Sequence, residues 1–416
     1  MLPKANILLF PSDELIRAEI YTQSKEMIAN RIYVLNQLLE GKADIVVCNV
    51  SSYTRFLPNP ELFKQKCLKL KVNKTYNVSE IKKTLISSGY SLVNKIDQSL
   101  QYAVRGDIID IFSVNHDNPI RIEFFDEQIE SIRFFNIATQ SSLEEIEEVV
   151  ILPGQEFLLT ENEYKNATEK IFNQLEKDEK QLPKNIFDEL KDNAANNLAE
   201  IMEYSFSAKL YRYYSFLQDK TYSLSDYLNG FNTILVDKEA CLSSNDLLLE
   251  ESTTYLYELF ESGKEISHLQ LNADIRRILT FESNLITTSS LKSNNEQLSF
   301  NAKQVPFVAN KTNDVINVIH SYLNEDYKVI VALSSKEHLN LLIESFEDSK
   351  IKYSMVNDLN MPSKGVGISI YPLVKGFVLD DEKIVYLTSS ELFSEKIKVA
   401  RFNNRFNNRN NNGDNF

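Results

Sequence analysis

The sequence predicts an α/β protein built from several domains. Two patterns carry this prediction. Apolar runs typical of buried parallel strands alternate with amphipathic helices near both ends of the chain. Between them, the stretch Tyr102–Phe135 is typical of consecutive antiparallel strands. The 416 residues, 43% of them hydrophobic, are enough for substantial cores in about two to four domains.

Residues 1–66 have an α/β pattern. Asn6–Phe10 is expected to form a strand and Ser24–Leu39 an amphipathic helix, and the apolar run Asp44–Val50 is typical of a parallel strand buried on both faces. Strand, helix, strand is the unit of nucleotide-binding folds. However, the ten glycines form neither GxxxxGK[ST] nor GxGxxG, so the sequence offers no loop that would hold a phosphate. Gly365–Gly367 precedes a strand and is expected to be a turn.

Residues 67–153 are expected to form an α+β module around a three-stranded meander in Tyr102–Phe135. Because successive side chains alternate across a strand, its middle strand has one apolar face and one mixed face. The first holds Ile120, Ile122 and Phe124, and the second holds Arg121, Glu123 and Phe125. A large ring beside an arginine on a charged face is the composition of a protein-binding hot spot. The alternative is that a second layer covers this face and Phe125 belongs to the core.

Residues 154–295 are expected to supply helices and a closing strand. Apolar residues recur at helical spacing from Glu161 onward, with a break at Pro183. Asn232–Val236 has the pattern of another buried strand, and the polar run Ile266–Asn301 is typical of a domain boundary. Residues 302–400 then show a new alternation of helices and strands, which predicts a small α/β domain.

Three clusters have two interpretations each. The aromatic cluster Tyr204–Phe216, which includes Lys209 and Arg212, favours helix packing, although such rings also stack single-stranded bases. Glu144–Glu148 is either an acidic patch for a basic partner or, as we expect, a solvated helical turn. The asparagine-rich tail 401–416 is expected to be disordered, although its three arginines also suit contact with phosphate or polymerase.

Composition excludes some classes of function. The formal net charge of −14 and the pI near 5.0 argue against a protein that mainly binds nucleic acid, because that affinity rests on clustered lysine and arginine. The three cysteines are far apart and only four histidines accompany them, so neither a disulfide framework nor a metal site is indicated. The sequence has no apolar run of the length that a membrane helix needs. A cytoplasmic location is expected.

Several motifs resemble a known family. RGDIIDIF, IRIEFFDEQIESIRFF and LEEIEEVVILPGQEF resemble the module that the excision-repair protein UvrB shares with the bacterial transcription-repair coupling factor, Mfd. FPSDELIRAE, RIYVLNQLLEGKADIVVCNV and YTRFLPNPELF are similar to the amino-terminal region of the coupling factor. The resemblance continues to about Phe393 and so spans nearly the whole chain.

The resemblance implies a fold. The first domain would be a degenerate RecA-like, P-loop-type domain without a nucleotide site, formed by residues 1–66 and 154–295. It would be interrupted by the UvrB-like module, with its first strand expected before Met1. The small α/β domain, residues 302–400, would follow. No cofactor is implied for this chain, and the family's motor and polymerase-binding domains are expected to be absent from it.

The resemblance also implies a partner. In the family the module binds UvrA, and the residues that match the contact are Arg105, Arg121 and Phe125. RNA polymerase and DNA would be bound only through domains outside this chain, which is therefore not expected to be an enzyme. Two alternatives remain: a fragment of a UvrB-like helicase, or a nucleic-acid-binding module that uses the Tyr204–Phe216 aromatics.

Overall fold

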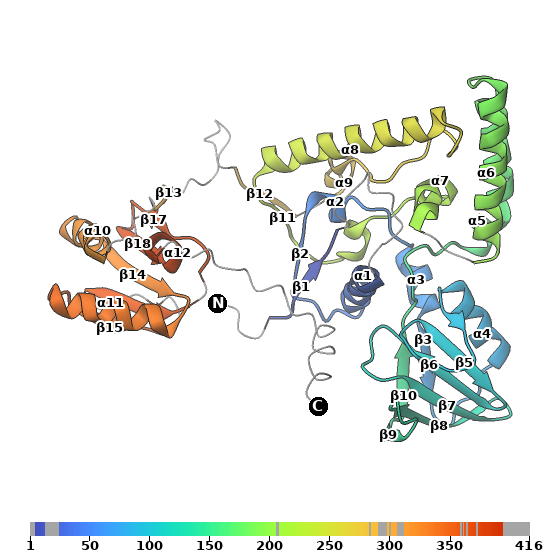
Figure 1. Ribbon diagram of the computed structural model, residues 1–416, viewed down its shortest axis with the longest axis horizontal. Coiled ribbons are helices and arrows are strands. Elements are labelled where there is room, and N and C mark those ends of the chain that lie inside the picture. Colours follow the sequence, from blue (N-terminus) through green and yellow to red (C-terminus); the bar gives the residue numbers. More distant parts are fainter. Residues whose placement is uncertain are drawn as a thin grey trace. The chain divides into compact units, whose positions relative to one another are not determined.

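The described residues form two-stranded parallel sheets, a two-stranded antiparallel ribbon and two six-stranded mixed sheets (Figure 1). The computed structural model describes residues 5–12, 25–204, 208–282, 284–289, 298, 301–305, 312–357, 360, 362, 365–371 and 373–393. The chain divides into two units, residues 1–290 and 291–416. Helices and mixed sheets occur in both units, which confirms the α/β class. The predicted tail 401–416 lies outside the described residues.

The first unit contains two short parallel sheets. In one, β1 (Ile7–Phe10) pairs with β2 (Ile45–Cys48), and in the other β11 (Thr233–Leu235) pairs with β12 (Leu285–Thr287). Between β1 and β2, helix α1 (Lys25–Leu39) contributes the apolar face that the helical spacing predicts, with Ile32 and Leu35 fully buried. Two short helices follow β2: α2 (Val50–Tyr53) and α3 (Pro60–Lys66), capped by Asn49 and Asn59.

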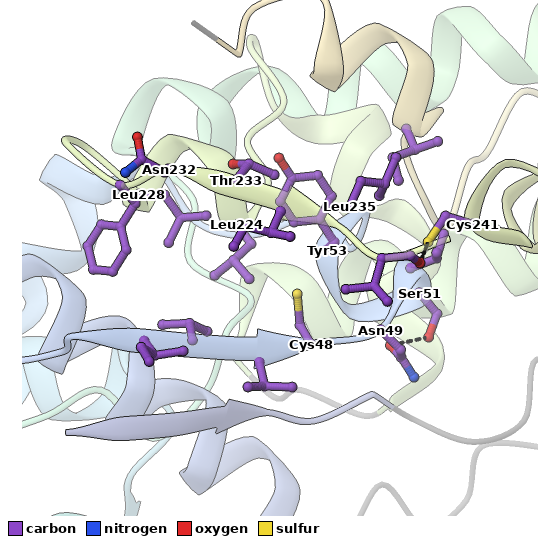
Figure 2. Close-up of a pocket in the computed structure, with 18 of the residues that line it drawn as sticks. Cys48, Asn49, Ser51, Tyr53, Leu224, Leu228, Asn232, Thr233, Leu235 and Cys241 are labelled. Carbon is purple, nitrogen blue, oxygen red and sulfur yellow. Dashed lines mark hydrogen bonds between the residues drawn. The ribbon is translucent and has the colours of Figure 1, made fainter. Parts of the chain in front are cut away.

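The prediction that both Asp44–Val50 and Asn232–Val236 are fully buried strands is wrong. Val47 is exposed on β2, and Ile234 and Val236 are exposed on or next to β11. The physical reason is that, among the described residues, each strand is paired along one edge only, so its other edge and the side chains next to it stay open (Figure 2). β11 also does not pair with β1 or β2.

The module contains a six-stranded sheet in the order β4-β5-β6-β7-β8-β9. The bounds are Ser91–Leu92, Gln101–Arg105, Ile108–Phe112, Ile120–Phe125, Gln128–Phe135 and Ser142–Glu145. Helix α4 (Val78–Ser87) covers one face of this sheet, and a two-stranded ribbon of β3 (Leu68–Lys71) and β10 (Glu148–Ile151) completes that core (Figure 1). Apolar side chains of all these elements form one cluster.

Two details of the module differ from the prediction. The stretch Tyr102–Phe135 contains four antiparallel strands rather than three, because Gly106-Asp107 forms a tight turn with a left-handed glycine that separates β5 from β6. Glu144–Glu148 is not a helical turn. It spans the end of β9 and the start of β10, where backbone pairing with β8 and β3 fixes an extended conformation.

Helices make up most of the remainder of the first unit. Around the break at Pro183, as predicted, lie α5 (Glu161–Asp178) and α6 (Lys184–Met202). They are followed by η1 (Ala208–Tyr213), α7 (Tyr214–Leu217), η2 (Leu224–Tyr227), α8 (Lys238–Glu261) and α9 (Ile275–Leu279). The run Ile266–Asn301, expected to be irregular, therefore contains α9 and β12, and Ile266 itself is buried.

A buried ion pair ties α1 to the segment that leaves the module. Arg31 is fully buried, and its Nε and Nη2 atoms each donate to Glu156 at 2.7 Å. Arg55 adds a third contact, 3.2 Å from Glu156 Oε2. Because bidentate arginine–carboxylate pairs fix orientation as well as distance, this pair holds the segment that leaves the module against α1.

The second unit is a six-stranded mixed sheet in the order β13-β17-β18-β14-β16-β15. The strand bounds are Ala302–Gln304, Phe377–Leu379, Ile384–Thr388, Lys328–Leu333, Val366–Ile370 and Tyr353–Met355. The helices are α10 (Thr312–Asn324), α11 (Lys336–Asp348) and α12 (Ser389–Phe393). The predicted helices at α10 and α11 and strands at β14, β16 and β18 are confirmed. Gly365 lies in a bend before β16, with a positive φ of 71°, as expected for a turn.

Candidate protein-binding site

The two faces of the module's sheet have different environments. One face packs into the module core with α4. On the other face Ala103 and Phe112 are buried with Ile96 in a small apolar cluster, which covers part of that face. The strand ends next to the turns at Gly106-Asp107 and Asp126-Glu127 stay open. These two turns lie at the same end of the sheet, because Ile108 on β6 pairs with Glu123 on β7.

Phe125 lies on the open face, at the last position of β7. Its neighbours on the strand follow the predicted alternation, since Ile120, Ile122 and Phe124 are buried. Phe125 itself is 71% exposed, so the interpretation that it belongs to the core is wrong. The turn that follows it holds Asp126 in the left-handed region, with φ of 55°, and this tight turn fixes the position of the ring at the end of the hairpin.

Arg121 lies on the same face, but its guanidinium group is paired within the module. Its Nε and Nη2 atoms donate to the two carboxylate oxygens of Asp110 at 2.7 and 2.9 Å. Nη2 also donates to Gln140 at 3.3 Å, and the guanidinium carbon lies 4.5 Å from the centre of the Phe135 ring. The side chain is only 16% exposed, and the hydrogen bonds to Asp110 raise the pKa of Arg121. Its charge is therefore largely neutralised before any partner arrives.

Arg105 is the more accessible of the two predicted arginines. It is the last residue of β5 and is exposed. Its Nη2 atom donates to the backbone carbonyl of Asn94 at 2.9 Å, an interaction that holds the side chain in place but leaves its charge uncompensated. The register Arg105↔Ile108↔Glu123 places it on the face that carries Phe125, one side-chain row from the ring.

A second ion pair on this face was missed by the sequence reasoning. Arg133 on β8 donates through Nη1 to Glu123 Oε2 at 2.9 Å, and its Nη2 atom also contacts Glu123. Ser131 donates to the same carboxylate at 2.8 Å. The hydrogen bonds from Arg133 lower the pKa of Glu123. Alternation counted from the buried Ile129 would have placed Arg133 on the core face, because a register shift between Glu123 and Phe124 breaks the alternation along β8. Both the face of Arg133 and its partner therefore depended on the strand register.

The ion pairs Arg121–Asp110 and Arg133–Glu123 lie next to each other on the open face. Arg121 and Arg133 lie directly opposite each other on β7 and β8, a like-charge pairing that is unfavourable when uncompensated. Each is neutralised by one carboxylate, Asp110 or Glu123, from a neighbouring strand position. The two ion pairs therefore hold β6, β7 and β8 together on this face, while Phe125 and Arg105 remain exposed at its edge.

The rim of the face is acidic. The turns and strand ends around Phe125 carry four exposed acidic residues: Asp107, Asp126, Glu127 and Glu130. A partner surface that buries the ring therefore meets one exposed guanidinium and several carboxylates at its edge. Such mixed charge selects a partner by complementarity rather than by net charge.

The described aromatic rings of the alternative site, Tyr204 and those from Tyr211 to Phe216, pack in or against the core. Tyr213 and Tyr214 are fully buried, and the Tyr214 hydroxyl exchanges hydrogen bonds with the backbone of Leu158. Lys209 and Arg212 are paired with Glu200 and Glu265. Rings in this environment cannot stack on bases, which confirms the helix-packing interpretation for these residues. Phe206 lies outside the described residues.

Among the described ranges no group of three or more histidine, cysteine, aspartate or glutamate side chains is arranged to hold a metal ion. No helix in the described part of the chain is both long and apolar enough to cross a membrane.

The chain is similar to known proteins over one segment and over nearly its whole length. Residues 68–157 match the family model of the UvrB interaction domain. The chain is 27% identical over 408 residues to the transcription-repair-coupling factor of Bacillus subtilis (strain 168), which covers 96% of this chain and 35% of that protein. It is 25% identical over 401 residues to the same factor from two Staphylococcus aureus strains, RF122 / ET3-1 and MRSA252, covering 94% of the chain and 34% of each relative. The chain thus spans about a third of the length of these relatives. The predicted resemblance is confirmed.

Proposed function

Since this chain resembles the amino-terminal region of transcription-repair coupling factors over nearly its whole length and carries a UvrB interaction domain, we propose that it acts in DNA repair by binding UvrA. The contact surface is the open face of the module's sheet. The observation that carries the proposal is the exposure of Phe125 within the matched residues 68–157. Surface aromatic rings next to arginine are the side chains that dominate binding energy at protein interfaces.

The three predicted contact residues have different roles in this proposal. Phe125 is the apolar anchor, because its ring is exposed and held at the end of a hairpin. Arg105 supplies an exposed guanidinium group to a carboxylate of the partner. Arg121, already paired with Asp110, acts mainly by holding the strands in register and presents only the edge of its guanidinium to UvrA.

The architecture extends the proposal to the rest of the chain. We assign residues 1–66 and 154–295 to a degenerate RecA-like domain, interrupted by the UvrB-like module of residues 67–153 and followed by the domain of residues 302–400. The absence of a phosphate-loop motif from the sequence supports a role without ATP hydrolysis. Contacts with RNA polymerase and DNA are assigned to other regions of the coupling factor, and the location to the cytoplasm.

A titration of the chain with purified UvrA tests the proposal. Calorimetry with the unaltered chain should give saturable binding, and Phe125→Ala should weaken it. The matched control is Phe172→Ala, because Phe172 is an exposed phenylalanine on α5, outside the matched domain. Failure of the unaltered chain to bind UvrA would reject the proposal. Saturable ATP binding in the same preparation would instead favour the helicase-like alternative.

A further inference from the structure

The row of paired residues that contains Phe125 continues beyond the β7-β8 hairpin. Phe125 pairs with Gln128 on β8, and Gln128 pairs on its other side with Thr75, in the loop between β3 and α4. Residues that pair directly across antiparallel strands direct their side chains to the same face of a sheet. Gln128 and Thr75 therefore lie on the open face, in one row with the Phe125 ring.

A β-bulge in β8 places Gln128 on this face. Strict alternation from Ser131, which lies on the open face, would direct Ile129 outward and Gln128 into the core. The register shifts at Glu130, which has no opposite residue on β7, so the alternation is displaced by one position. Ile129 is consequently buried and Gln128 exposed. Bulges of this kind are frequent next to functional sites, where they redirect a side chain.

Main-chain hydrogen bonds hold the row in place. In the loop between β3 and α4, Asn73 donates its N–H to the carbonyl of Ile129 at 2.8 Å, and Ile129 donates to the carbonyl of Lys74 at 2.9 Å. Tyr76 donates to the carbonyl of Glu127 at 2.8 Å. The start of β8 is therefore paired with β7 on one edge and with this loop on the other. Because this backbone is already fixed, a partner that binds here has little ordering to overcome.

The row carries uncharged polar groups that are free to bind. The side chains of Gln128 and Thr75 are exposed and have no hydrogen-bond partner among the described residues. In this they differ from Arg121 and Glu123, whose charged groups are paired within the sheet. An amide group has two N–H donors and an acceptor oxygen, and a hydroxyl group both donates and accepts. The row thus presents neutral hydrogen-bonding groups beside an apolar ring.

The row is short enough to lie within one interface. Neighbouring paired residues lie about 5 Å apart, so Thr75 lies about 10 Å from Phe125. A protein interface of ordinary size buries about 800 Å² on each partner, which corresponds to a disc of about 16 Å radius. A partner centred on Phe125 therefore covers Gln128 and Thr75 as well.

We propose that Gln128 and Thr75 determine the specificity of the surface that binds UvrA, through hydrogen bonds to uncharged polar groups of the partner beside the site that receives Phe125. This inference rests on the proposed function and extends it to a row of residues that crosses β8. An exposed ring alone fits many apolar surfaces, whereas a polar group that is buried without a hydrogen-bond partner weakens binding. The row therefore discriminates against a partner that offers only an apolar surface.

Substitutions that preserve side-chain shape test the proposal by calorimetric titration with purified UvrA. Gln128→Met keeps the length of the side chain but removes its amide group, and it should raise the Kd about tenfold. Thr75→Val keeps the β-branched shape but removes the hydroxyl group, and it should raise the Kd about threefold. The matched control is Gln270→Met, because Gln270 is exposed and lies outside the matched domain. It should leave the Kd unchanged.

Salt dependence and stability separate neutral hydrogen bonds from other effects. Between about 0.1 M and about 1 M salt the Debye length falls from about 10 Å to about 3 Å. The fold-change in Kd caused by Gln128→Met should stay the same over this range, whereas the fold-change caused by Arg105→Ala should decrease. In urea denaturation, Gln128→Met and Thr75→Val should keep the midpoint of the unaltered chain, because exposed side chains contribute little to stability.

Three results would overturn the proposal. If Phe125→Ala weakens UvrA binding but Gln128→Met and Thr75→Val do not, UvrA binds at the ring without the rest of the row, and only the proposed function stands. If Gln128→Met weakens binding and also lowers the urea midpoint, Gln128 acts on the stability of the hairpin rather than on the partner. If the unaltered chain does not bind UvrA, this inference and the proposed function fail together.

Discussion

Replacing Phe125 by alanine should weaken UvrA binding strongly while leaving the fold unchanged. A phenylalanine side chain presents about 200 Å² of surface, and Phe125 is 71% exposed, so about 140 Å² is available for burial by a partner. At about 25 cal/mol per Å² this area corresponds to about 3.5 kcal/mol. Part of that is offset by ordering at the interface, which leaves about 2 kcal/mol, or about 30-fold in Kd. The free energy of unfolding should change by less than about 0.5 kcal/mol, because an exposed ring makes few contacts.

Two measurements on the same protein samples decide the outcome. Urea denaturation gives the free energy of unfolding, and calorimetric titration with UvrA gives the Kd. The Kd for UvrA should rise in Phe125→Ala while the free energy of unfolding stays constant, and Phe172→Ala should leave both unaltered. A loss of stability of more than about 2 kcal/mol would show that the ring supports the core, and an unchanged Kd in a folded variant would show that UvrA binds elsewhere.

Further predictions concern the charged residues of the same face. Arg121→Ala should lower the free energy of unfolding by about 2–3 kcal/mol, because it leaves the nearly buried Asp110 carboxylate without its partner. In urea denaturation, the double variant with Asp110→Ala should recover part of this loss. If stability does not recover, the two side chains are not energetically paired. Arg105→Ala should raise the Kd for UvrA about tenfold, because a charge-assisted hydrogen bond is lost, while the free energy of unfolding stays constant. A Kd equal to that of the unaltered chain would show that Arg105 is not part of the site. Hydrogen bonds from Arg133 lower the pKa of Glu123 below its ordinary value of 4.5. The contribution of Glu123 to stability is therefore complete above pH 4.5, and it is lost as the pH falls through the lower pKa of the folded state. Thermal denaturation between pH 6 and about pH 3 should therefore show a smaller loss of stability in Glu123→Gln than in the unaltered chain, and identical profiles would show that the Arg133 pair contributes nothing.

Local patterns were sufficient where a residue's environment depends on its own strand or helix. The alternation in Ile120–Phe125 predicted which side chains are buried, and helical spacing predicted α1, α5 and α6 on both sides of the break at Pro183. The predicted number of strands in Tyr102–Phe135 is one too few, since the tight turn at Gly106-Asp107 makes β5 and β6 separate strands. The helical turn predicted at Glu144–Glu148 is also wrong, because pairing with distant strands overrides local preference there.

The sequence by itself determined that Phe125 and Arg121 share one face of a strand, because side-chain direction along a strand has a period of two residues. Only the tertiary structure decided that Arg121 is paired with Asp110 while Arg105 keeps an accessible charge, since the partner of a guanidinium depends on which strand lies alongside and in which register. The open edges of β2 and β11 among the described strands were equally invisible in the sequence. Apolar runs such as Ile45–Cys48 indicate that a strand needs neighbours on both edges, but they do not say whether both neighbours are present.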